Sequence, residues 1–474
     1  MIAQFLNRDV VLNQLRQIED VTRFDRDKAA AAGEPVDDHD LVLHELDAAA
    51  QRETTSSGQS SFNPPADDRR GSGSSVAPPM DDYVFISRDP IVSLLQSALD
   101  ELYDNPEHAM QVQVDRPASD RRGAEPDSMV TDRSLTHVPV VRAGDDRRYF
   151  EQFSVTDARW VRSKLAEGIR LIRRRRAFNA NPAKTATLEN NSRLVLVGDW
   201  GTGLPRARAV AAQMRATIDE ALSDGRRVHV IHLGDVYYSG WGNEYRKRFL
   251  PYWPVHPDEA ETIGSWTLNG NHDMYSGGHA YYDVALADPR FARWQADDRG
   301  SATSYFSIVG SEWQVLALDS SWDDGGLQEP QASWLRDALA SAGARKTLVL
   351  SHHQLFSAYE HGAKDLGAKI APVLADHPLT AWFWGHEHRC MWFERHQNVS
   401  FGRCLGDGGV PVYQWHGLKD DYPVPGTYEC RRFFKRGLER WAVMGFAIFD
   451  VNGSSLDVRY IDETGFEHNK ETIA

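Results

Sequence analysis

Apolar residues follow different patterns in the two parts of this chain. In residues 1–50, and again in residues 155–178, they recur three or four positions apart, which is typical of amphipathic helices. From residue 191 onward, short apolar runs alternate with helical stretches, and the chain closes on runs of alternating apolar and polar residues. The pattern predicts an N-terminal, mainly helical region followed by an α/β domain of strands and crossover helices.

The part before residue 191 is predicted to divide into three regions. Residues 1–50 form a helical segment, residues 51–80 a flexible linker, and residues 81–190 an accessory region with a partly disordered stretch and one long helix over 155–178. This helix ends in the arginine run 173–176. The run could contact an anionic partner, but a solvated helix end, where cations suit the helix dipole, explains it more simply.

Residues 191–474 are predicted to form one α/β domain. The expected strands are Leu194–Val197, the run that ends at Asp235, Trp266–Leu268, Tyr305–Val309, Trp313–Leu318, Leu348–Leu350 and Ala381–Trp384, and the expected helices are Pro205–Leu222, Pro330–Ala342 and Ala363–Leu374. Near the end, Asn452-Gly453 between two alternating runs predicts a β-hairpin. The fold class that fits is two mixed β-sheets packed as a sandwich and flanked by helices.

Composition restricts the kinds of partner and the cellular location. The formal net charge of −15 argues against broad, sequence-independent binding of nucleic acid. The three cysteines form no Cys-x-x-Cys pair and are too few for a disulfide framework, which favours a reducing compartment. The N-terminus carries acidic residues without a long apolar core, and no window holds the roughly 18 apolar residues of a membrane span. A cytoplasmic protein without a membrane segment is therefore expected.

Five short motifs at predicted strand ends carry the candidate chemistry. They are Gly198-Asp199-Trp200-Gly201, Gly234-Asp235-x-x-Tyr238, Gly270-Asn271-His272-Asp273, Val349-x-x-His352 and Gly385-His386-Glu387-His388. Oxygen and imidazole side chains without cysteine suit Fe, Zn or Mn. His386 and His388 cannot both serve one face of a helix, but a tight loop can present them to two metal ions. Each motif is weak alone, and the ordered set predicts a metal site.

Across residues 192–465 this ordered set resembles the calcineurin-like metallophosphoesterases, and most of all the purple acid phosphatases. Gly201 stands where the superfamily usually has a histidine, and Tyr238 is the tyrosine that the purple acid phosphatase pattern supplies instead. The resemblance implies two metal ions that share Asp235. Metal 1, an iron ion, would be bound by Asp199, Asp235, Tyr238 and His388, and metal 2, an Fe, Zn or Mn ion, by Asp235, Asn271, His352 and His386.

The same resemblance implies the reaction and its catalytic residues. Residues 191–474 would be the metallophosphoesterase catalytic domain, a dinuclear phosphoester hydrolase in which a metal-bound hydroxide attacks phosphorus. His272 would protonate the leaving group, Asp273 would orient the His272 ring, and His361 would bind substrate. His353, beside His352, is expected to pack near the ligands rather than to be one of them.

Several alternatives stay open at this point. A phosphodiesterase acting on nucleotides or nucleic acid belongs to the same superfamily, and monoester and diester substrates are not distinguished. A protein Ser/Thr phosphatase is disfavoured because residues 234–240 lack Gly-Asp-x-x-Asp-Arg-Gly. A regulatory or binding protein could use residues 1–190 to dock a protein partner. The long connections 241–263 and 402–440 are expected to select the substrate.

Overall fold

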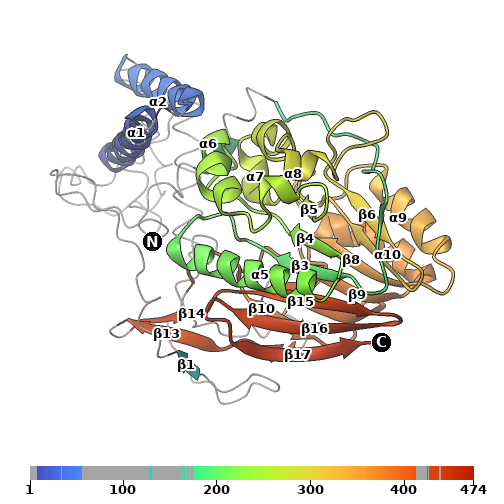
Figure 1. The fold of residues 1–474 in the computed structure, drawn as a ribbon. Helices are drawn as coiled ribbons and strands as arrows, with labels where there is room; N and C mark the ends of the chain where they lie inside the picture. The colour runs from blue at the N-terminus through green and yellow to red at the C-terminus, as the bar shows by residue number, and fades with distance from the viewer. Residues whose placement is uncertain are drawn as a thin grey trace, which may run out of the picture. The chain divides into compact units, whose positions relative to one another are not determined.

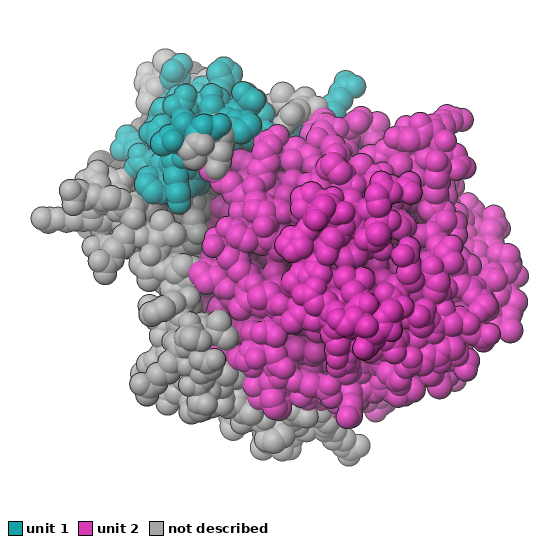
Figure 2. Space-filling view, viewed as in Figure 1, with its two compact units in different colours: residues 1–111, 140–174 teal, residues 112–139, 175–474 magenta. Residues whose placement is uncertain are grey.

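The computed structural model shows two compact units, residues 1–111 with 140–174 and residues 112–139 with 175–474 (Figures 1 and 2). The structure describes residues 8–31, 33, 35–55, 128–130, 163, 166–167, 170, 174–359, 361–412, 424, 426–436 and 439–474. The predicted linker beyond residue 55, the disorder-leaning stretch and most of the accessory region lie outside the described residues. The helices and strands described below belong to these ranges.

The first unit contains a pair of helices, α1 (Arg8–Ala31) and α2 (Asp37–Thr55), which confirms the helical N-terminal segment. Their apolar faces meet through buried side chains, among them Leu15 on α1 and Leu46 on α2. An ion pair of 2.7 Å between Arg26 and Asp40 joins the two helices at the surface. The second helix runs on to Thr55, so residues 51–55 of the predicted linker are helical.

The prediction of one helix over 155–178 is wrong at its C-terminal end. The described residues 163, 166–167 and 170 are helical, but residues 174–180 have no helical structure, and Arg174 has a φ of 65°. The arginine side chains explain the difference. Arg175 pairs with Asp324, and Arg176 pairs with Asp283 at 3.3 Å, so both bind loops of the second unit instead of extending a solvated helix end.

The second unit contains two large sheets and one small sheet. The six-stranded sheet has the order β17 (Glu467–Ile473), β16 (Ser455–Asp462), β15 (Gly445–Asn452), β3 (Arg193–Val197), β4 (Val228–His232) and β5 (Gly264–Thr267). The eight-stranded sheet has the order β12 (Gly426–Glu429), β10 (Cys390–Phe393), β11 (Val399–Leu405), β9 (Leu379–Trp384), β8 (Lys346–Ser351), β7 (Trp313–Ala317), β6 (Phe306–Val309) and β2 (Ala186–Thr187). The small sheet joins β1 (Ser128–Val130), β13 (Arg432–Arg436) and β14 (Glu439–Ala442).

The two large sheets pack face to face over one apolar core, which confirms the predicted sandwich. Successive side chains of a strand point to opposite faces, so Leu348 and Leu350 of β8 enter this core while Val349 faces the other way. Rings from the two sheets meet in the core, as Phe383 of β9 and Phe449 of β15 do at a centroid distance of 4.8 Å. Both sheets mix parallel and antiparallel neighbours, as predicted.

Helices cover the outer faces of the sandwich (Figure 1). Helix α5 (Pro205–Ser223) packs on the six-stranded sheet through Val210, Met214 and Ile218, and Pro205 at its first turn suits a helix start. Helices α9 (Gln331–Ala340) and α10 (Lys364–Asp376) share a second apolar cluster with the eight-stranded sheet. Shorter turns lie between β4 and β6: α6 (Gly242–Glu244), η3 (Tyr245–Phe249), η4 (Leu250–Tyr252), η5 (Pro257–Glu259), α7 (Asn271–Tyr275), η6 (Tyr281–Ala285) and α8 (Pro289–Ala292).

Two other sequence expectations can be compared with these elements. The hairpin is confirmed: β15 and β16 pair in antiparallel register, and Gly453 takes the positive φ of 61° that the turn requires. The stretch 402–440 is more than a connection, since it contains β12, β13 and the end of β11. The boundary predicted at residue 191 is too late, because β2 already pairs with β6 and the second unit resumes at residue 175.

Among the described residues, no helix combines the length and the apolar character that a membrane crossing needs. The three cysteines are free thiols, and Cys390 and Cys404 are buried.

The sandwich core gives a test of the fold. Phe383 is fully buried between the sheets, so Phe383→Ala should lower the free energy of unfolding by about 3–5 kcal/mol through lost burial and a cavity. The matched control is Phe466→Ala, because Phe466 is 51% exposed and contacts the Arg432 guanidinium; it should cost about 1 kcal/mol or less. Urea unfolding followed by circular dichroism measures both. Equal losses for the two variants would contradict the assigned core.

Candidate metal centre

The candidate centre begins where the parallel strands β3 and β4 end side by side. Val197 and His232 are paired at the last register position, and a Gly-Asp turn follows in each strand region, so Asp199 and Asp235 emerge at the same edge of the sheet. Both aspartates have a left-handed backbone, with φ of 56° and 77°. Such a conformation costs non-glycine residues roughly 1–3 kcal/mol and is concentrated at functional sites.

Two glycines let neighbouring backbone approach these carboxylates closely. A Cβ on Gly270 would lie 1.9 Å from Asp235 Oδ1, and a Cβ on Gly385 would lie 2.6 Å from Asp199 Oδ2. Neither position can carry a side chain without moving a carboxylate. The glycines of the third and fifth motifs therefore bring Asn271 and His386 to the aspartates.

One side of the cluster is formed by an amide and two imidazoles. Asn271 Oδ1 lies 3.0 Å from His352 Nε2 and 3.0 Å from His386 Nδ1. His352 donates its Nδ1–H to the Leu233 carbonyl at 3.0 Å, which leaves Nε2 unprotonated toward Asn271 and Asp235. The His386 backbone N–H donates to Asp199 Oδ2 at 2.7 Å. The structure thus brings these three predicted ligands together with both aspartates.

The other side contains a tyrosine, but it is not the predicted one. The Tyr237 hydroxyl lies 2.9 Å from Asp199 Oδ1, 3.1 Å from Asp235 Oδ2 and 2.8 Å from His388 Nε2. The ring of Tyr238 lies under the Arg248 guanidinium, 5.0 Å from ring centroid to Cζ. The sequence-based assignment of Tyr238 is corrected to Tyr237.

The path of the backbone explains this correction. Val236 forms a short parallel bridge with Gly201, in which Gly201 N–H donates to the Asp235 carbonyl and Tyr237 N–H to the Gly201 carbonyl, both at 3.2 Å. These two hydrogen bonds fix the backbone on either side of Val236, and along this path the Tyr237 hydroxyl reaches both aspartates. A Cβ on Gly201 would lie 2.6 Å from Val236 Cα, so the bridge needs glycine there. The glycine at position 201 is therefore needed for the backbone path that brings Tyr237 to the aspartates.

The predicted partnership of His272 and Asp273 is also corrected. Asp273 accepts hydrogen bonds from the backbone N–H groups of Asp235 at 2.8 Å and Gly270 at 2.6 Å, and from the Tyr245 hydroxyl. It therefore holds the Asp235 turn instead of orienting the His272 ring. His272 Nδ1 lies 2.6 Å from the Tyr238 carbonyl, so this carbonyl fixes the ring. Burial lowers the pKa of His272 to about 3 and raises that of Asp273 to about 6.

The remaining histidines occupy different positions. His361 is exposed, and its carbonyl accepts a hydrogen bond from Gln354 at 3.1 Å, so it lies outside the buried cluster. His353 is buried, and its ring centroid lies 4.8 Å from that of His386. The ring nitrogens of His352, His353 and His386 lie within 4.8 Å of one another, a group that could hold a metal ion. Their packing together agrees with the expectation that His353 lies near the ligands.

Two buried acidic residues that the motifs did not indicate support the site. Glu244 accepts hydrogen bonds from the backbone N–H groups of Tyr238 at 2.6 Å, Ser239 at 3.0 Å and Trp241 at 3.0 Å, and so holds the loop after Asp235. Asp407 follows β11 beside the Asp199 turn, and its Oδ1 has no hydrogen-bond partner among the described residues. Glu244 acts locally, on backbone three to six residues before it, whereas Asp407 is brought to the Asp199 turn by the fold.

The electrostatics of the cluster fit bound cations. Asp199 and Asp235 are at most 1% exposed, and within the described part of the chain their partners are imidazoles, the Tyr237 hydroxyl and backbone N–H groups, with no Lys or Arg. Burial, and then the charge of Asp199, raises the pKa of Asp235 well above its ordinary range. Buried carboxylates that lack a protein cation are costly unless a metal ion balances them. Asp199, Asp235 and His352 also form a group able to hold such an ion.

Comparisons with known proteins show what this chain is similar to. Residues 192–390 match the family described as calcineurin-like phosphoesterase. Tartrate-resistant acid phosphatase type 5 of Rattus norvegicus is 25% identical over 299 residues, which cover 58% of this chain and 87% of that protein. The 3',5'-cyclic adenosine monophosphate phosphodiesterase CpdA of Escherichia coli K12 is 34% identical over 131 residues, 26% of this chain and 42% of that protein. Purple acid phosphatase PPD1 from yellow lupin seeds superposes with a TM-score of 0.46 at 15% identity, covering 62% of this chain and 55% of that one.

The buried Asp407 predicts a pH dependence of stability. Burial, together with the charges of Glu463 and Asp199, raises the pKa of Asp407 to about 7. The folded protein then keeps a proton that the unfolded chain loses above about pH 4, so stability falls as the pH rises from about 4 to about 7. Asp407→Asn should remove this contribution, up to ~1.4 kcal/mol per pH unit within that window. Urea unfolding at a series of pH values measures it, and parallel stability curves for the two proteins would refute the assignment.

Proposed function

The chain belongs to the calcineurin-like phosphoesterases and is most similar to their purple acid phosphatase branch, and on this premise we propose that it is a dinuclear metal-dependent phosphoester hydrolase. One observation carries the proposal. Two buried carboxylates at adjacent strand ends have no Lys or Arg partner in the described structure, while neutral oxygen and nitrogen ligands converge on both. A pair of metal ions balances those charges and uses those ligands.

The ligands divide into two sets around Asp235. Asp199, Tyr237 and His388 would hold one metal ion, and Asn271, His352 and His386 the other, with Asp235 in contact with members of both sets. The first set carries the anionic oxygen ligands that suit iron, and the second suits Fe, Zn or Mn. When bound, the metal ions would supply an activated water and the charge that stabilises the phosphoryl group in an in-line displacement.

The chain's own groups would orient the substrate and move the proton. His272, whose ring is fixed at Nδ1 by the Tyr238 carbonyl, would exchange a proton with the leaving-group oxygen. Its ring lies 4.5 Å from that of Tyr237, so it is next to the ligand set without being part of it. Asp273 and Glu244 would keep the loop between Asp235 and Trp241 in place, which fixes both the tyrosine and the carbonyl that orients His272. His361 is retained as a substrate-binding candidate from its exposed loop.

A phosphodiesterase is the second candidate activity. The similarity to the cyclic-nucleotide phosphodiesterase of Escherichia coli, 34% identical over 131 residues, favours it as the alternative. Both activities would use the same ligands, so the substrate decides between them. A protein partner for residues 1–190 is a separate proposal, for which α1 and α2 provide the described surface.

The central experiment measures metal and hydrolysis together. The purified protein should contain about two metal ions per chain and hydrolyse p-nitrophenyl phosphate, and bis(p-nitrophenyl) phosphate tests the diesterase alternative. Gly270→Ala should lower the turnover by at least about 100-fold and should also lower the metal content, since its Cβ would displace Asp235. Gly367→Ala on α10 is the matched control, because its Cβ meets no atom within 4 Å.

Less than one metal ion per chain after metal loading, combined with no hydrolysis of either ester by the wild-type protein, would overturn the proposed function. A Gly270→Ala variant that keeps full metal content and turnover would instead refute the assigned position of Asp235.

The tyrosine ligand has its own test. With iron bound, a phenolate ligand gives a visible charge-transfer band, and Tyr237→Phe should abolish it because the Tyr237 hydroxyl is the one in contact with Asp199, Asp235 and His388. Tyr238→Phe is the matched control and should keep the band, since that ring packs under Arg248. Visible spectra of the two variants at equal iron content decide the assignment, and the reverse pattern would restore Tyr238.

A further inference from the structure

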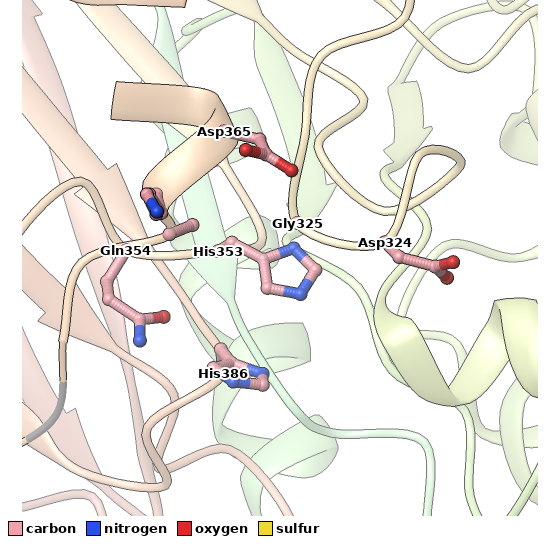
Figure 3. Close-up of a pocket in the computed structure, with 8 residues that line it drawn as sticks. Asp324, Gly325, His353, Gln354, Asp365 and His386 are labelled. Atoms are coloured by element: carbon pink, nitrogen blue, oxygen red, sulfur yellow. The ribbon is translucent and has the colours of Figure 1, made fainter. Parts of the chain in front are cut away.

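A polar pocket of about 540 Å³ lies next to the candidate metal centre (Figure 3). It is lined by Asp324, Gly325, His353, Gln354, Ala363, Lys364, Asp365 and His386. His386 belongs to both the pocket and the ligand cluster, so a substrate whose phosphorus is held at the cluster has the pocket beside it. The volume is that of a small-molecule site.

Besides His386, three chain segments form the walls, and hydrogen bonds hold them in place. Leu366 N–H at the start of α10 donates to the Gly325 carbonyl at 3.2 Å, and Ala363 N–H donates to the Gln354 carbonyl at 3.0 Å. Arg175 pairs with Asp324 and donates to the Trp322 carbonyl, which fixes the third wall. The pocket is therefore built into the fold and does not depend on one loose loop.

His353 connects this pocket with the metal centre. It is only 8% exposed, and its Nδ1 lies 3.1 Å from Ser320 Oγ and 3.2 Å from Ser321 Oγ. With Nδ1 held by these hydroxyls, the other edge of the ring is available to the pocket. Figure 3 shows the ring between His386 on one side and Asp365 on the other. A ligand that extends from the metal centre toward Asp365 would therefore contact His353.

The chemistry of the walls indicates the kind of group that fits. The described lining contains no Phe, Tyr or Trp and one small aliphatic side chain, Ala363, so an aryl group buries little apolar surface there. The charges around the pocket also offset one another, because Arg175 pairs with Asp324 and the lining contains both Lys364 and Asp365. A neutral group with several hydroxyls matches such walls, because carboxylates accept and ammonium or amide groups donate hydrogen bonds.

Resting on the proposed function, we propose that this pocket binds the alcohol half of the phosphoester, and that this alcohol is a sugar or another polyol. Asp365, on the first turn of α10, would accept hydrogen bonds from its hydroxyls, and His353 would contact the hydroxyl-bearing carbon chain next to phosphorus. The pocket would thus determine specificity while the metal centre determines reactivity.

The experiment compares a polyol phosphate with an aryl phosphate in the full-length protein. Asp365→Ala should lower kcat/KM for glucose 6-phosphate about tenfold, the effect of losing one hydrogen bond to a charged group, and lower that for p-nitrophenyl phosphate by less than about threefold. Ala363→Leu should raise KM for glucose 6-phosphate more than KM for p-nitrophenyl phosphate by filling the pocket. Asp376→Ala, at the exposed end of the same helix, is the matched control and should behave as wild type.

The outcomes separate this inference from the proposed function. One outcome is that the wild-type protein hydrolyses p-nitrophenyl phosphate and that Asp365→Ala changes kcat/KM equally for both esters, or for neither. This outcome would overturn the pocket assignment and leave the proposed hydrolase function intact. The pocket assignment would also be overturned if the wild-type protein prefers the aryl ester and Ala363→Leu leaves this preference unchanged. Absence of hydrolysis of every ester by the metal-loaded wild type would overturn both. Retained p-nitrophenyl phosphate turnover in the variants shows that they are folded.

Discussion

The arrangement of this site depends on two buried carboxylates that the protein itself does not neutralise. Asp199 and Asp235 leave adjacent parallel strands at the same edge, in left-handed backbone conformations that ordinary side chains avoid. Burying two like charges in this way is unfavourable without a cation. The ligands, the close glycines and the loop that follows Asp235 can all be understood as features that hold this pair in position for metal ions.

Most of the polar side chains described around this pair hold backbone segments in position and are not expected to contact the substrate. Asp273 accepts hydrogen bonds from the backbone N–H groups of the Asp235 turn and of Gly270. Glu244 accepts hydrogen bonds from the backbone N–H groups of the loop that follows. A buried carboxylate that satisfies several N–H groups at once is worth more than isolated pairs, because each group would otherwise be buried without a partner. The strain at Asp235 is thus held by hydrogen bonds whose donors and acceptors come from different elements, which makes the centre rigid before any metal binds.

The metal centre is assembled from strand ends of both large sheets, and the pocket lies on one side of it. The aspartates follow strands of the six-stranded sheet, whereas His352, His353 and His386 follow β8 and β9 of the eight-stranded sheet. The packing of the two sheets over one core brings these ends together. The pocket extends from the histidine side, where α10 and the loop at Gly325 supply its walls, so its lining can vary without disturbing the aspartates.

The sequence by itself determined the strand-and-helix order, the hairpin at Asn452-Gly453, and the side-chain types that meet at the strand ends. These features depend on local periodicity and turn chemistry, which are visible in one dimension. Tertiary structure decided which of two adjacent tyrosines faces the aspartates, because the Val236–Gly201 bridge sets the side on which Tyr237 lies. It also turned Asp273 toward backbone N–H groups and the arginine run toward Asp283 and Asp324. In each case the partner is distant in sequence, so only the folded chain brings it within hydrogen-bond distance.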